Sequence, residues 1–340
     1  MVTDLLHLTN IRVDTIKTNY KMKIISYLFL CLSLLSCKNA SKPVVVAIDS
    51  LSDSNLNYQT IKQAVDAISQ NAPQTCNYAC LREQIQRYSK TGIAAVAISE
   101  SLIRKHIAAL NDAEKDSIYV LFTNMYYEAS RVLSDCIDSK YTDLTQKIEQ
   151  KIHDSQVTNF EQCLDICGMC LSSTEGAYYA GEKPDYLFSL FSGRGSAALD
   201  EYLKLTNKEL KEGYVDDAAL LISFDNLYKR VLAWEDFINN YPKSFLITEA
   251  QGYYNSYLGT LLSGLDNSRV FDSETNKLIP ELQALYEQIV SKNDSRKSSK
   301  TIAEFYALVK SNNFSMPATL NQFLDERGLS SMLGVQPETR

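Results

Sequence analysis

Residues 220–240 read LLISFDNLYKRVLAWEDFINN. Within them, Leu220, Leu227, Val231, Trp234 and Ile238 follow one another at steps of seven, four, three and four residues. This spacing places apolar side chains along one face of an α-helix. Stretches with the same period continue along the chain, separated by short breaks. They predict helices over residues 57–70, 76–90, 93–110, 112–138, 141–153, 158–172, 184–191, 196–212, 215–240, 244–263, 279–292, 299–311 and 316–326.

The composition favours the same fold class. The chain of 340 residues is 45% hydrophobic and 22% charged, which is typical of a folded globular protein. Only 12 glycines and 7 prolines are present beside 21 tyrosines and 12 phenylalanines, so turn residues for a many-stranded sheet are scarce. We therefore expect an all-α fold, a multi-helix array of helical hairpins for which solenoid-like stacking is one arrangement.

The N-terminal segment has the three parts of an export signal. Lys21 and Lys23 precede the apolar stretch 24–35, which is shorter than the ~20 residues needed to cross a bilayer. The stretch leads into Leu34-Leu35-Ser36-Cys37. This ending resembles the lipobox of bacterial lipoproteins, in which the cysteine is acylated and becomes the first residue of the mature chain.

The resemblance implies an organisation for the N-terminal part. Residues 22–36 are the signal peptide, residues 37–56 are the lipidated Cys37 with a flexible tether, and residues 1–21 are a mis-annotated extension. The residues after Cys37 lack the acidic run that resembles a surface-export signal in Bacteroidota lipoproteins, and they lack an Asp that resembles an inner-membrane retention signal. The expected location is the cell envelope, lipid-anchored at the periplasmic face of the outer membrane, with the membrane as one partner.

The mature chain is acidic. Without residues 1–36 it has 30 basic and 39 acidic residues, a formal net charge of −9. A surface of this charge does not suit binding to nucleic acid or to anionic lipid. We therefore expect no nucleic-acid partner.

Two helical subdomains are expected after the tether, over residues 57–175 and 184–327, followed by a tail at 328–340. In the second, the stretch 237–244 is echoed at 289–295, and each stretch ends one helix, turns, and begins another. These units resemble the helix, Tyr-Pro-x-Ser, helix junctions of tetratricopeptide-like periplasmic lipoproteins. The tetratricopeptide signature of Trp, Leu-Gly and Tyr at fixed offsets is absent.

Six cysteines remain once Cys37 is acylated, and an even number in an exported protein favours disulfides. They are Cys76, Cys80, Cys136, Cys163, Cys167 and Cys170. Two residues spaced i, i+4 on a helix have Cβ atoms ~5–6 Å apart, which is too far for a disulfide. We therefore expect three bonds between helices, namely Cys76–Cys167, Cys80–Cys163 and Cys136–Cys170.

The same cysteines fit other chemistry. Cys163-x3-Cys167-x2-Cys170 matches the spacing of the iron–sulfur ligands in radical S-adenosylmethionine enzymes, and Cys167-Gly168-Met169-Cys170 resembles a thioredoxin-like Cys-x-x-Cys. Four reduced thiolates would also suit zinc. The pattern indicates neither the (β/α) barrel of the first family nor the βαβ unit of the second. No cofactor and no metal site is expected.

Three tyrosine doublets supply candidates for a binding surface. Neighbours on a helix point about 100° apart, so one member of a doublet can be core while the other lies at a rim. The loop Gly193-Arg194-Gly195 could cradle an anion with its backbone, or serve only as a connection between helices. The candidate surface residues are Tyr127, Tyr179, Tyr254 and Arg194.

The sequence contains no recognisable catalytic constellation. His106 and His153 are the only histidines of the mature chain, and each is alone within a predicted helix. Glu100-Ser101 resembles the Glu-Ser pair of lytic transglycosylases, but their Gly-Leu-Met-Gln segment is absent. No catalytic residue is assigned.

Two functions remain. The favoured one is a non-catalytic envelope lipoprotein, a helical scaffold that binds a protein or another macromolecular partner. The alternative is an envelope enzyme or glycan-binding protein that acts near peptidoglycan or imported polysaccharide. A single cleft with converging carboxylates and exposed tyrosines would favour the alternative, and a long groove without perturbed titratable groups would favour the scaffold.

Overall fold

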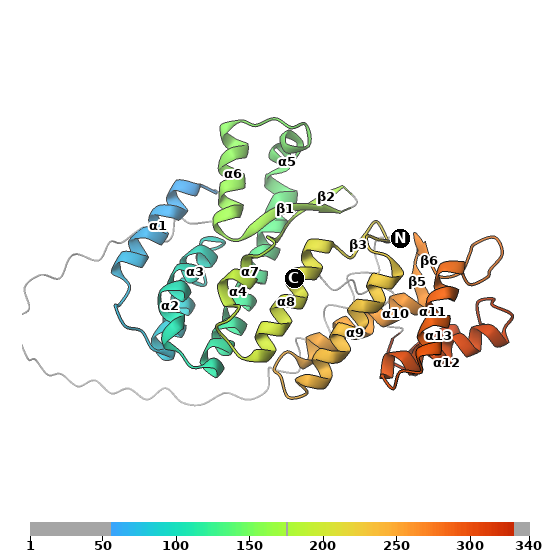
Figure 1. The fold of residues 1–340 in the computed structure, drawn as a ribbon. Helices are drawn as coiled ribbons and strands as arrows, with labels where there is room; N and C mark the ends of the chain where they lie inside the picture. The colour runs from blue at the N-terminus through green and yellow to red at the C-terminus, as the bar shows by residue number, and fades with distance from the viewer. Residues whose placement is uncertain (1–55, 175, 330–340) are drawn as a thin grey trace, which may run out of the picture. The chain divides into compact units, whose positions relative to one another are not determined.

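The computed structural model describes residues 56–174 and 176–329 (Figure 1). The predicted signal peptide, Cys37 and nearly all of the tether lie outside the described residues, as does the chain from 330 onward. Over the described residues, no helix combines the length and the apolar character that crossing a membrane requires.

Helices dominate the described chain, and the prediction of a mostly all-α fold is confirmed. A short 3₁₀ turn, η2 (Ile107–Ala109), continues the third helix. The α-helices of the described residues are α1 (Tyr58–Asn71), α2 (Tyr78–Tyr88), α3 (Ala94–His106), α4 (Asp112–Lys140), α5 (Thr142–Glu149), α6 (Ser155–Ile166), α7 (Tyr186–Phe191), α8 (Ala197–Glu212), α9 (Phe224–Asn240), α10 (Ile247–Ser263), α11 (Pro280–Lys292), α12 (Lys297–Ser311) and α13 (Leu320–Asp325).

Short polar side chains fix where several helices begin. At α4, Asn111 Oδ1 accepts from the backbone N–H of Glu114 at 3.0 Å, and Glu114 Oε2 accepts from the backbone N–H of Asn111 at 3.0 Å. Asn57, Asn77 and Asp154 cap α1, α2 and α6 through their own side-chain oxygens. Each contact satisfies an N–H group that the first turn of a helix leaves open.

The apolar stripe of residues 220–240 lies inside the protein. Leu227, Val231 and Trp234 are fully buried on α9, and Ile238 packs against the core from the same helix. The stripe is shorter than predicted because Ser223 Oγ accepts from Asn226 N and begins the helix there. Leu220, the first residue of the predicted stripe, belongs to a strand.

Three antiparallel strand pairs interrupt the helices of the described chain where the periodic pattern predicted helix or a break. They are β1 (Met169–Thr174) with β2 (Ala177–Glu182), β3 (Val215–Asp216) with β4 (Ala219–Leu220), and β5 (Gly264–Leu265) with β6 (Ser268–Arg269). The longest pair packs on α4, where Ser130 Oγ donates to the carbonyl of Ala180 at 2.6 Å and Ser134 Oγ accepts from its N–H at 3.1 Å. Contacts with a helix distant in sequence thus stabilise a hairpin that the local sequence does not predict.

Gly168 explains why the predicted helix 158–172 ends early. Its φ is +66°, a conformation that favours glycine, and a Cβ added there would lie 2.3 Å from the ring of Tyr186. The helix therefore stops at Ile166, and the chain turns directly into β1. As a result, Cys163 lies on a helix while Cys170 lies on a strand.

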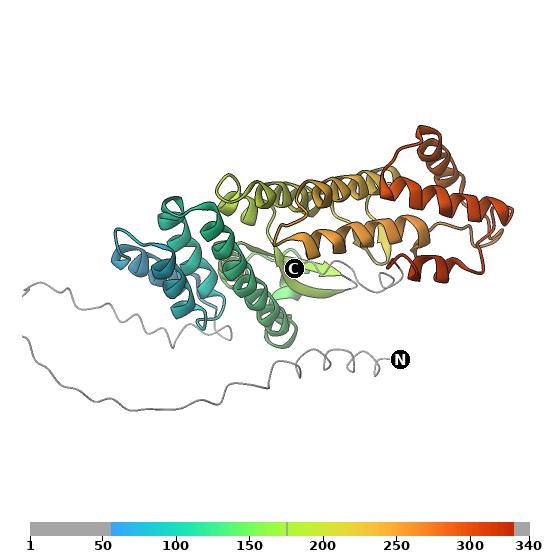
Figure 2. The same ribbon diagram turned by 90° about the horizontal axis from the view of Figure 1, so that it is seen from below.

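Elements close in sequence pack on one another (Figures 1 and 2). Helices α1, α2 and α4 contact α3, and each helix from α7 to α10 contacts the next. Farther on, α12 contacts α9, α10 and α11. Buried residues from Ile61 to Leu329 form a continuous hydrophobic cluster. The division into subdomains at 57–175 and 184–327 stays a prediction.

The predicted cysteine pairing is wrong. A disulfide joins Cys76 to Cys80, with their Cα atoms 5.4 Å apart, so neither residue is available to Cys167 or Cys163. The i, i+4 argument fails because Cys76 precedes the N-cap Asn77 and lies outside the helix. Cys136 and Cys170 are not joined to each other either.

Candidate ligand-binding site

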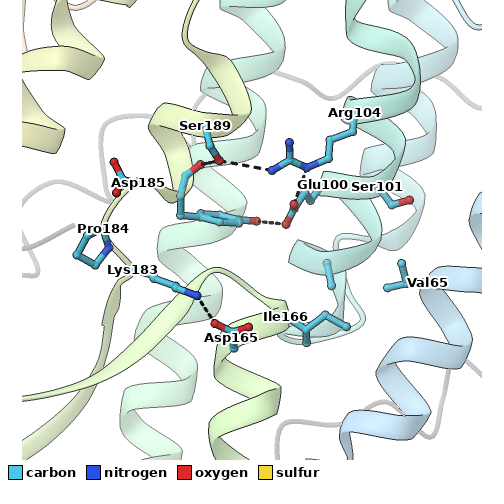
Figure 3. A pocket seen from close by; sticks show the side chains of 12 residues that line it. Val65, Glu100, Ser101, Arg104, Asp165, Ile166, Lys183, Pro184, Asp185 and Ser189 are labelled. Carbon is cyan, nitrogen blue, oxygen red and sulfur yellow. Dashed lines mark hydrogen bonds and ion pairs between the residues drawn. The ribbon is translucent and has the colours of Figure 1, made fainter.

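Two hollows of the described residues contain charged side chains. The first, which we call the charged cleft, has a volume of about 520 Å³ and is lined by α1, α3, α6 and the segment from Lys183 into α7. Glu100 accepts from Arg104 Nε at 2.7 Å (Figure 3). It also accepts from the Tyr186 hydroxyl at 2.8 Å. Lys183 pairs with Asp165 across the cleft. Glu100, the residue of the transglycosylase-like pair, is therefore held by partners from the chain itself.

The second hollow, which we call the tyrosine pocket, has a volume of about 390 Å³, within the range of small-molecule sites. Its walls come from α4, α7, α8, α9, α10, the end of β2 and adjoining loops. The tyrosines and charged residues that line it are Tyr119, Tyr127, Tyr202, Tyr214, Tyr253, Tyr257, Glu182, Glu209, Glu249 and Arg230. The pocket thus combines aromatic surface with several carboxyl groups.

Regular spacing along two helices brings many of these side chains to the pocket. On α10, Glu249, Tyr253 and Tyr257 lie at i, i+4 and i+8. On α4, Tyr119 and Tyr127 lie at i and i+8. Residues with this spacing share one helix face, so each helix presents a polar aromatic stripe to the same hollow.

Glu209 on α8 is held by two donors. Its Oε1 accepts from Trp234 Nε1 at 2.8 Å, and its Oε2 accepts from the Tyr257 hydroxyl at 2.7 Å. Burial raises the pKa of Glu209 to about 7, although nearby Arg230 acts in the opposite direction. This carboxyl group therefore changes its protonation near neutral pH.

Glu182, at the end of β2, has fewer and longer hydrogen bonds than Glu209. Its carboxyl group accepts a hydrogen bond from the Tyr127 hydroxyl at 3.4 Å, and none of the ion pairs found among the described residues includes it. Burial raises the pKa of Glu182 to about 8. An acidic group in this state is a candidate for a functional role, because nothing in the surrounding protein compensates its charge.

Arg230 on α9 brings positive charge to the Glu209 side of the pocket. Its Nη2 donates to the carbonyl of Gly213 at 2.6 Å and to Glu212 Oε2 at 3.1 Å. Its guanidinium lies over the ring of Tyr257, 5.6 Å from the centroid. Within the described structure, Nε and Nη1 of this buried side chain have no hydrogen-bond partner. Buried donors without partners are rare and favour a site that a ligand or ordered water completes.

Apolar side chains line the mouth of the pocket. Val120 and Phe245 are 39% and 41% exposed and both belong to its lining. The ring of Phe245 meets that of Tyr119 edge-on at 6.4 Å between centroids. Exposed apolar groups beside a polar hollow are typical of ligand-binding sites.

The tyrosine doublets divide between core and pocket. Tyr126 is buried and donates to the carbonyl of Gly168 at 2.7 Å, whereas Tyr127 lines the tyrosine pocket. The assignment for the doublet on α10 is wrong, since Tyr254 is only 2% exposed and Tyr253 lines the pocket instead.

The helical argument for the tyrosine doublets does not apply to Tyr179, because it lies on β2. In a strand, successive side chains alternate between the two faces. Tyr179 is opposite Ser172 of β1, and the residues that line the two hollows do not include it.

The Arg194 loop does bind anionic groups with its backbone, but they are side chains of the protein itself. The N–H of Gly193 donates to Asp200 Oδ1 at 2.7 Å, and the N–H of Ser196 donates to Asp116 Oδ1 at 3.0 Å. Arg194 Nη1 donates to the carbonyl of Leu190 at 2.9 Å. These contacts give the loop a structural role between α7 and α8.

Of the four remaining thiols of the described residues, two are buried and two, Cys136 and Cys170, are half-buried. Cys163 is buried, and burial raises its pKa to about 12, which disfavours the reactive thiolate. Cys167 is also buried, and its Sγ donates to the carbonyl of Ile93 at 3.3 Å. Cys170 Sγ donates to the carbonyl of Glu182 at 3.6 Å. Across residues 56–174 and 176–329, no three His, Cys, Asp or Glu side chains are grouped to hold a metal ion.

The candidate residues chosen from sequence missed most of the tyrosine pocket. Glu182, Glu209, Glu249 and Arg230 were not among them. A usable signal was present in Glu249-x3-Tyr253-x3-Tyr257, where a polar stripe runs along a predicted helix. No protein-family model matches the chain, and comparison with curated proteins and with solved structures gave no match either.

Proposed function

We propose that this protein is a lipid-anchored envelope protein that binds a carbohydrate in the tyrosine pocket. The observation that carries the proposal is the meeting of six tyrosines and three glutamates in one hollow. Of the two functions that the sequence left open, this combination supports the glycan-binding one through its converging carboxyl groups and perturbed titratable groups, while its tyrosines are buried or half-buried rather than exposed. The macromolecular scaffold stays a prediction.

The chemistry of the lining suits a sugar. Tyrosine rings have apolar faces that suit the C–H surfaces of a pyranose, and a tyrosine oxygen that donates to the protein can still accept a hydrogen bond from a sugar hydroxyl. Carboxyl groups accept hydrogen bonds from sugar hydroxyls, and Arg230 offers donors to ring or hydroxyl oxygens. A purely apolar ligand would leave these polar groups without partners, at a cost of about 1–3 kcal/mol each.

The single tryptophan of the chain provides a direct test. Trp234 stacks on Tyr253 with 4.5 Å between ring centroids, and its Nε1 donates to Glu209. A sugar that contacts Tyr253 or Glu209 should therefore change the tryptophan emission in a saturable way. Titration of the mature protein with mono- and disaccharides, checked by calorimetry, measures this change.

Matched variants locate the binding. Tyr253→Ala should weaken binding by at least tenfold in calorimetry, because it removes a ring from the pocket wall. Glu100→Gln changes the charged cleft and should leave the affinity unchanged. The proposal fails if no saccharide binds, or if Glu100→Gln abolishes binding while Tyr253→Ala does not.

A further inference from the structure

On the premise that the tyrosine pocket binds a carbohydrate, we propose that its ligand is an amino sugar whose protonated amine binds among tyrosine rings at Glu182. The proposal deepens the proposed function by naming the charge of the ligand and the end of the pocket that recognises it. It depends on three features of the described residues: an acid without a compensating cation, a group of rings around it, and a difference between the two ends of the pocket.

The first feature is the incomplete environment of Glu182. The only hydrogen bond to its carboxyl group within the described structure comes from the Tyr127 hydroxyl, at the long distance of 3.4 Å. A half-buried carboxylate without a cation is disfavoured, and the desolvation raises the pKa of Glu182 to about 8, so that the protonated form is favoured at pH 7. An ammonium group placed beside Glu182 would supply the missing partner and restore the ionised form.

The second feature is the aromatic surface next to this acid. Tyr127 donates to Glu182 and belongs to the same pocket lining as Tyr119, Tyr202 and Tyr253. The rings of Tyr202 and Tyr253 meet edge-on with 6.3 Å between centroids. Tyrosine faces attract cations, so an aromatic lining that includes a carboxyl group suits an ammonium group.

The third feature is the asymmetry of the pocket. Glu209 has Arg230 as an electrostatic neighbour, together with donors from Trp234 and Tyr257. None of these groups contributes to the pKa of Glu182. Arg230 repels a cation and Glu182 attracts one, so the amine is directed to Glu182 and the uncharged hydroxyls of the sugar to Glu209.

The experiment compares three disaccharides that differ in one substituent. They are the β-1,4-linked dimers of glucosamine, of N-acetylglucosamine and of glucose, titrated into the mature protein by calorimetry at pH 7. The glucosamine dimer should bind at least tenfold more tightly than the other two. Titrations in buffers of different ionisation enthalpy should show that binding releases most of one proton from Glu182, after subtraction of the protons that the partly ionised amine takes up.

Glu182→Gln is the decisive variant, since it keeps an acceptor for Tyr127 and removes the ionisable group. It should bind all three dimers with similar affinity and without proton release. Asp165→Asn, in the charged cleft, is the matched control and should keep the preference for the amine.

If Glu182→Gln does not fold, a measurement on the unchanged protein still tests the proposal. Binding of the amine requires Glu182 to ionise, and this ionisation is less favourable at pH 5.5 than at pH 7, so the preference for the glucosamine dimer should fall about tenfold. The other titratable groups that face this end are Tyr119 and Tyr127 on α4, Tyr202 on α8, and Glu249 and Tyr253 on α10. Tyr127 and Tyr202 do not ionise in this range, because burial raises their pKa further above the usual value.

The outcomes separate the two proposals. Equal or weaker binding of the glucosamine dimer relative to the neutral dimers overturns the amine inference and leaves carbohydrate binding intact. Absence of binding by all three dimers, with binding of the simple diamine putrescine, overturns the carbohydrate function while supporting an ammonium site at Glu182. Absence of binding by all four compounds overturns both.

Discussion

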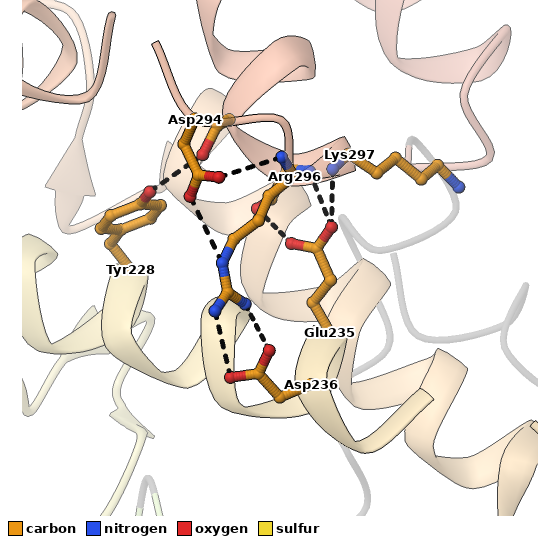
Figure 4. Close-up of polar contacts among 8 residues, drawn as sticks. Tyr228, Glu235, Asp236, Asp294, Arg296 and Lys297 are labelled. Atoms are coloured by element: carbon orange, nitrogen blue, oxygen red, sulfur yellow. Dashed lines mark hydrogen bonds and ion pairs between the residues drawn. The ribbon is translucent and has the colours of Figure 1, made fainter. Parts of the chain in front are cut away.

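Glu182 is a half-buried acidic side chain and Glu235 a buried one, and their hydrogen-bond partners differ greatly. Glu235, which is 5% exposed, accepts from the backbone N–H groups of Lys297 at 2.7 Å and Ser298 at 3.3 Å, and also from the Ser298 hydroxyl (Figure 4). These donors form the beginning of α12, where the helix dipole also favours negative charge. The carboxyl group of Glu182 has one long contact and faces a hollow.

The contrast separates a structural acid from one that is open to a ligand. Glu235 ties α9 to the first turn of α12 and leaves no room for another partner. Glu182 lies among groups that do not complete its hydrogen bonding, in a pocket large enough for a small molecule. We infer that burial alone does not identify a functional acid, whereas burial without partners does.

The largest expected effect comes from removing Glu235. Glu235→Ala would leave the N–H groups of α12 and the Ser298 hydroxyl buried without an acceptor, which should lower the free energy of unfolding by about 3 kcal/mol. Urea denaturation at pH 7 measures this loss.

The next residue along α9 is the matched control. Asp236 pairs with Arg296 at the surface, and its side chain is 51% exposed. Asp236→Ala should therefore change the free energy of unfolding by less than about 1 kcal/mol. If the two substitutions have equal effects, Glu235 does not have the structural role that its contacts indicate.

The second effect is a dependence of stability on pH that originates at Glu182. Its pKa is raised from an ordinary value of 4.5 to about 8 in the folded protein, so the folded state binds the proton more tightly than the unfolded chain. Its contribution is therefore fully present below pH 4.5 and is lost as pH rises to about 8.

Glu182→Gln removes this dependence. The variant should match the unchanged protein at low pH and exceed it at pH 8.5 by on the order of 2 kcal/mol, a figure reduced from the full linkage value because the pocket admits solvent. Glu209, whose pKa is raised to about 7, contributes equally to both proteins, so the difference between them isolates Glu182. Parallel stability curves for the two proteins from pH 5 to 8.5 would show that the pH dependence does not originate at Glu182.

The sequence predicts this molecule well where the cause is local. The stripe of Leu227, Val231 and Trp234 is buried as its period indicates, and the all-α class follows from many such stripes. The β1–β2 hairpin could not be predicted in the same way, because it depends on Ser130 and Ser134 of a helix far away in the chain.

The pocket illustrates the same limit. The stripe Glu249, Tyr253 and Tyr257 is visible in the sequence, but its meeting with Glu182 and Arg230 depends on how α4, α8, α9 and α10 pack. The Cys76–Cys80 bond was not predicted because the start of the helix was placed two residues too early, at Cys76.

The smallest expected effect concerns two tyrosine hydroxyl groups on α10. As with Glu235 and Glu182, one of them is more completely hydrogen-bonded than the other. Tyr257 donates to Glu209 at 2.7 Å, so Tyr257→Phe should lower the free energy of unfolding by about 1–2 kcal/mol. The buried hydroxyl of Tyr254 has no hydrogen-bond partner within the described structure, so Tyr254→Phe should be neutral or stabilising by a few tenths of a kcal/mol. Urea denaturation of both variants at pH 6 checks the difference. A larger loss for Tyr254→Phe than for Tyr257→Phe would mean that the Tyr254 hydroxyl has a hydrogen-bond partner in solution. In that case, the absence of a hydrogen bond in the structure would not separate a group that is open to a ligand from one that stabilises the fold.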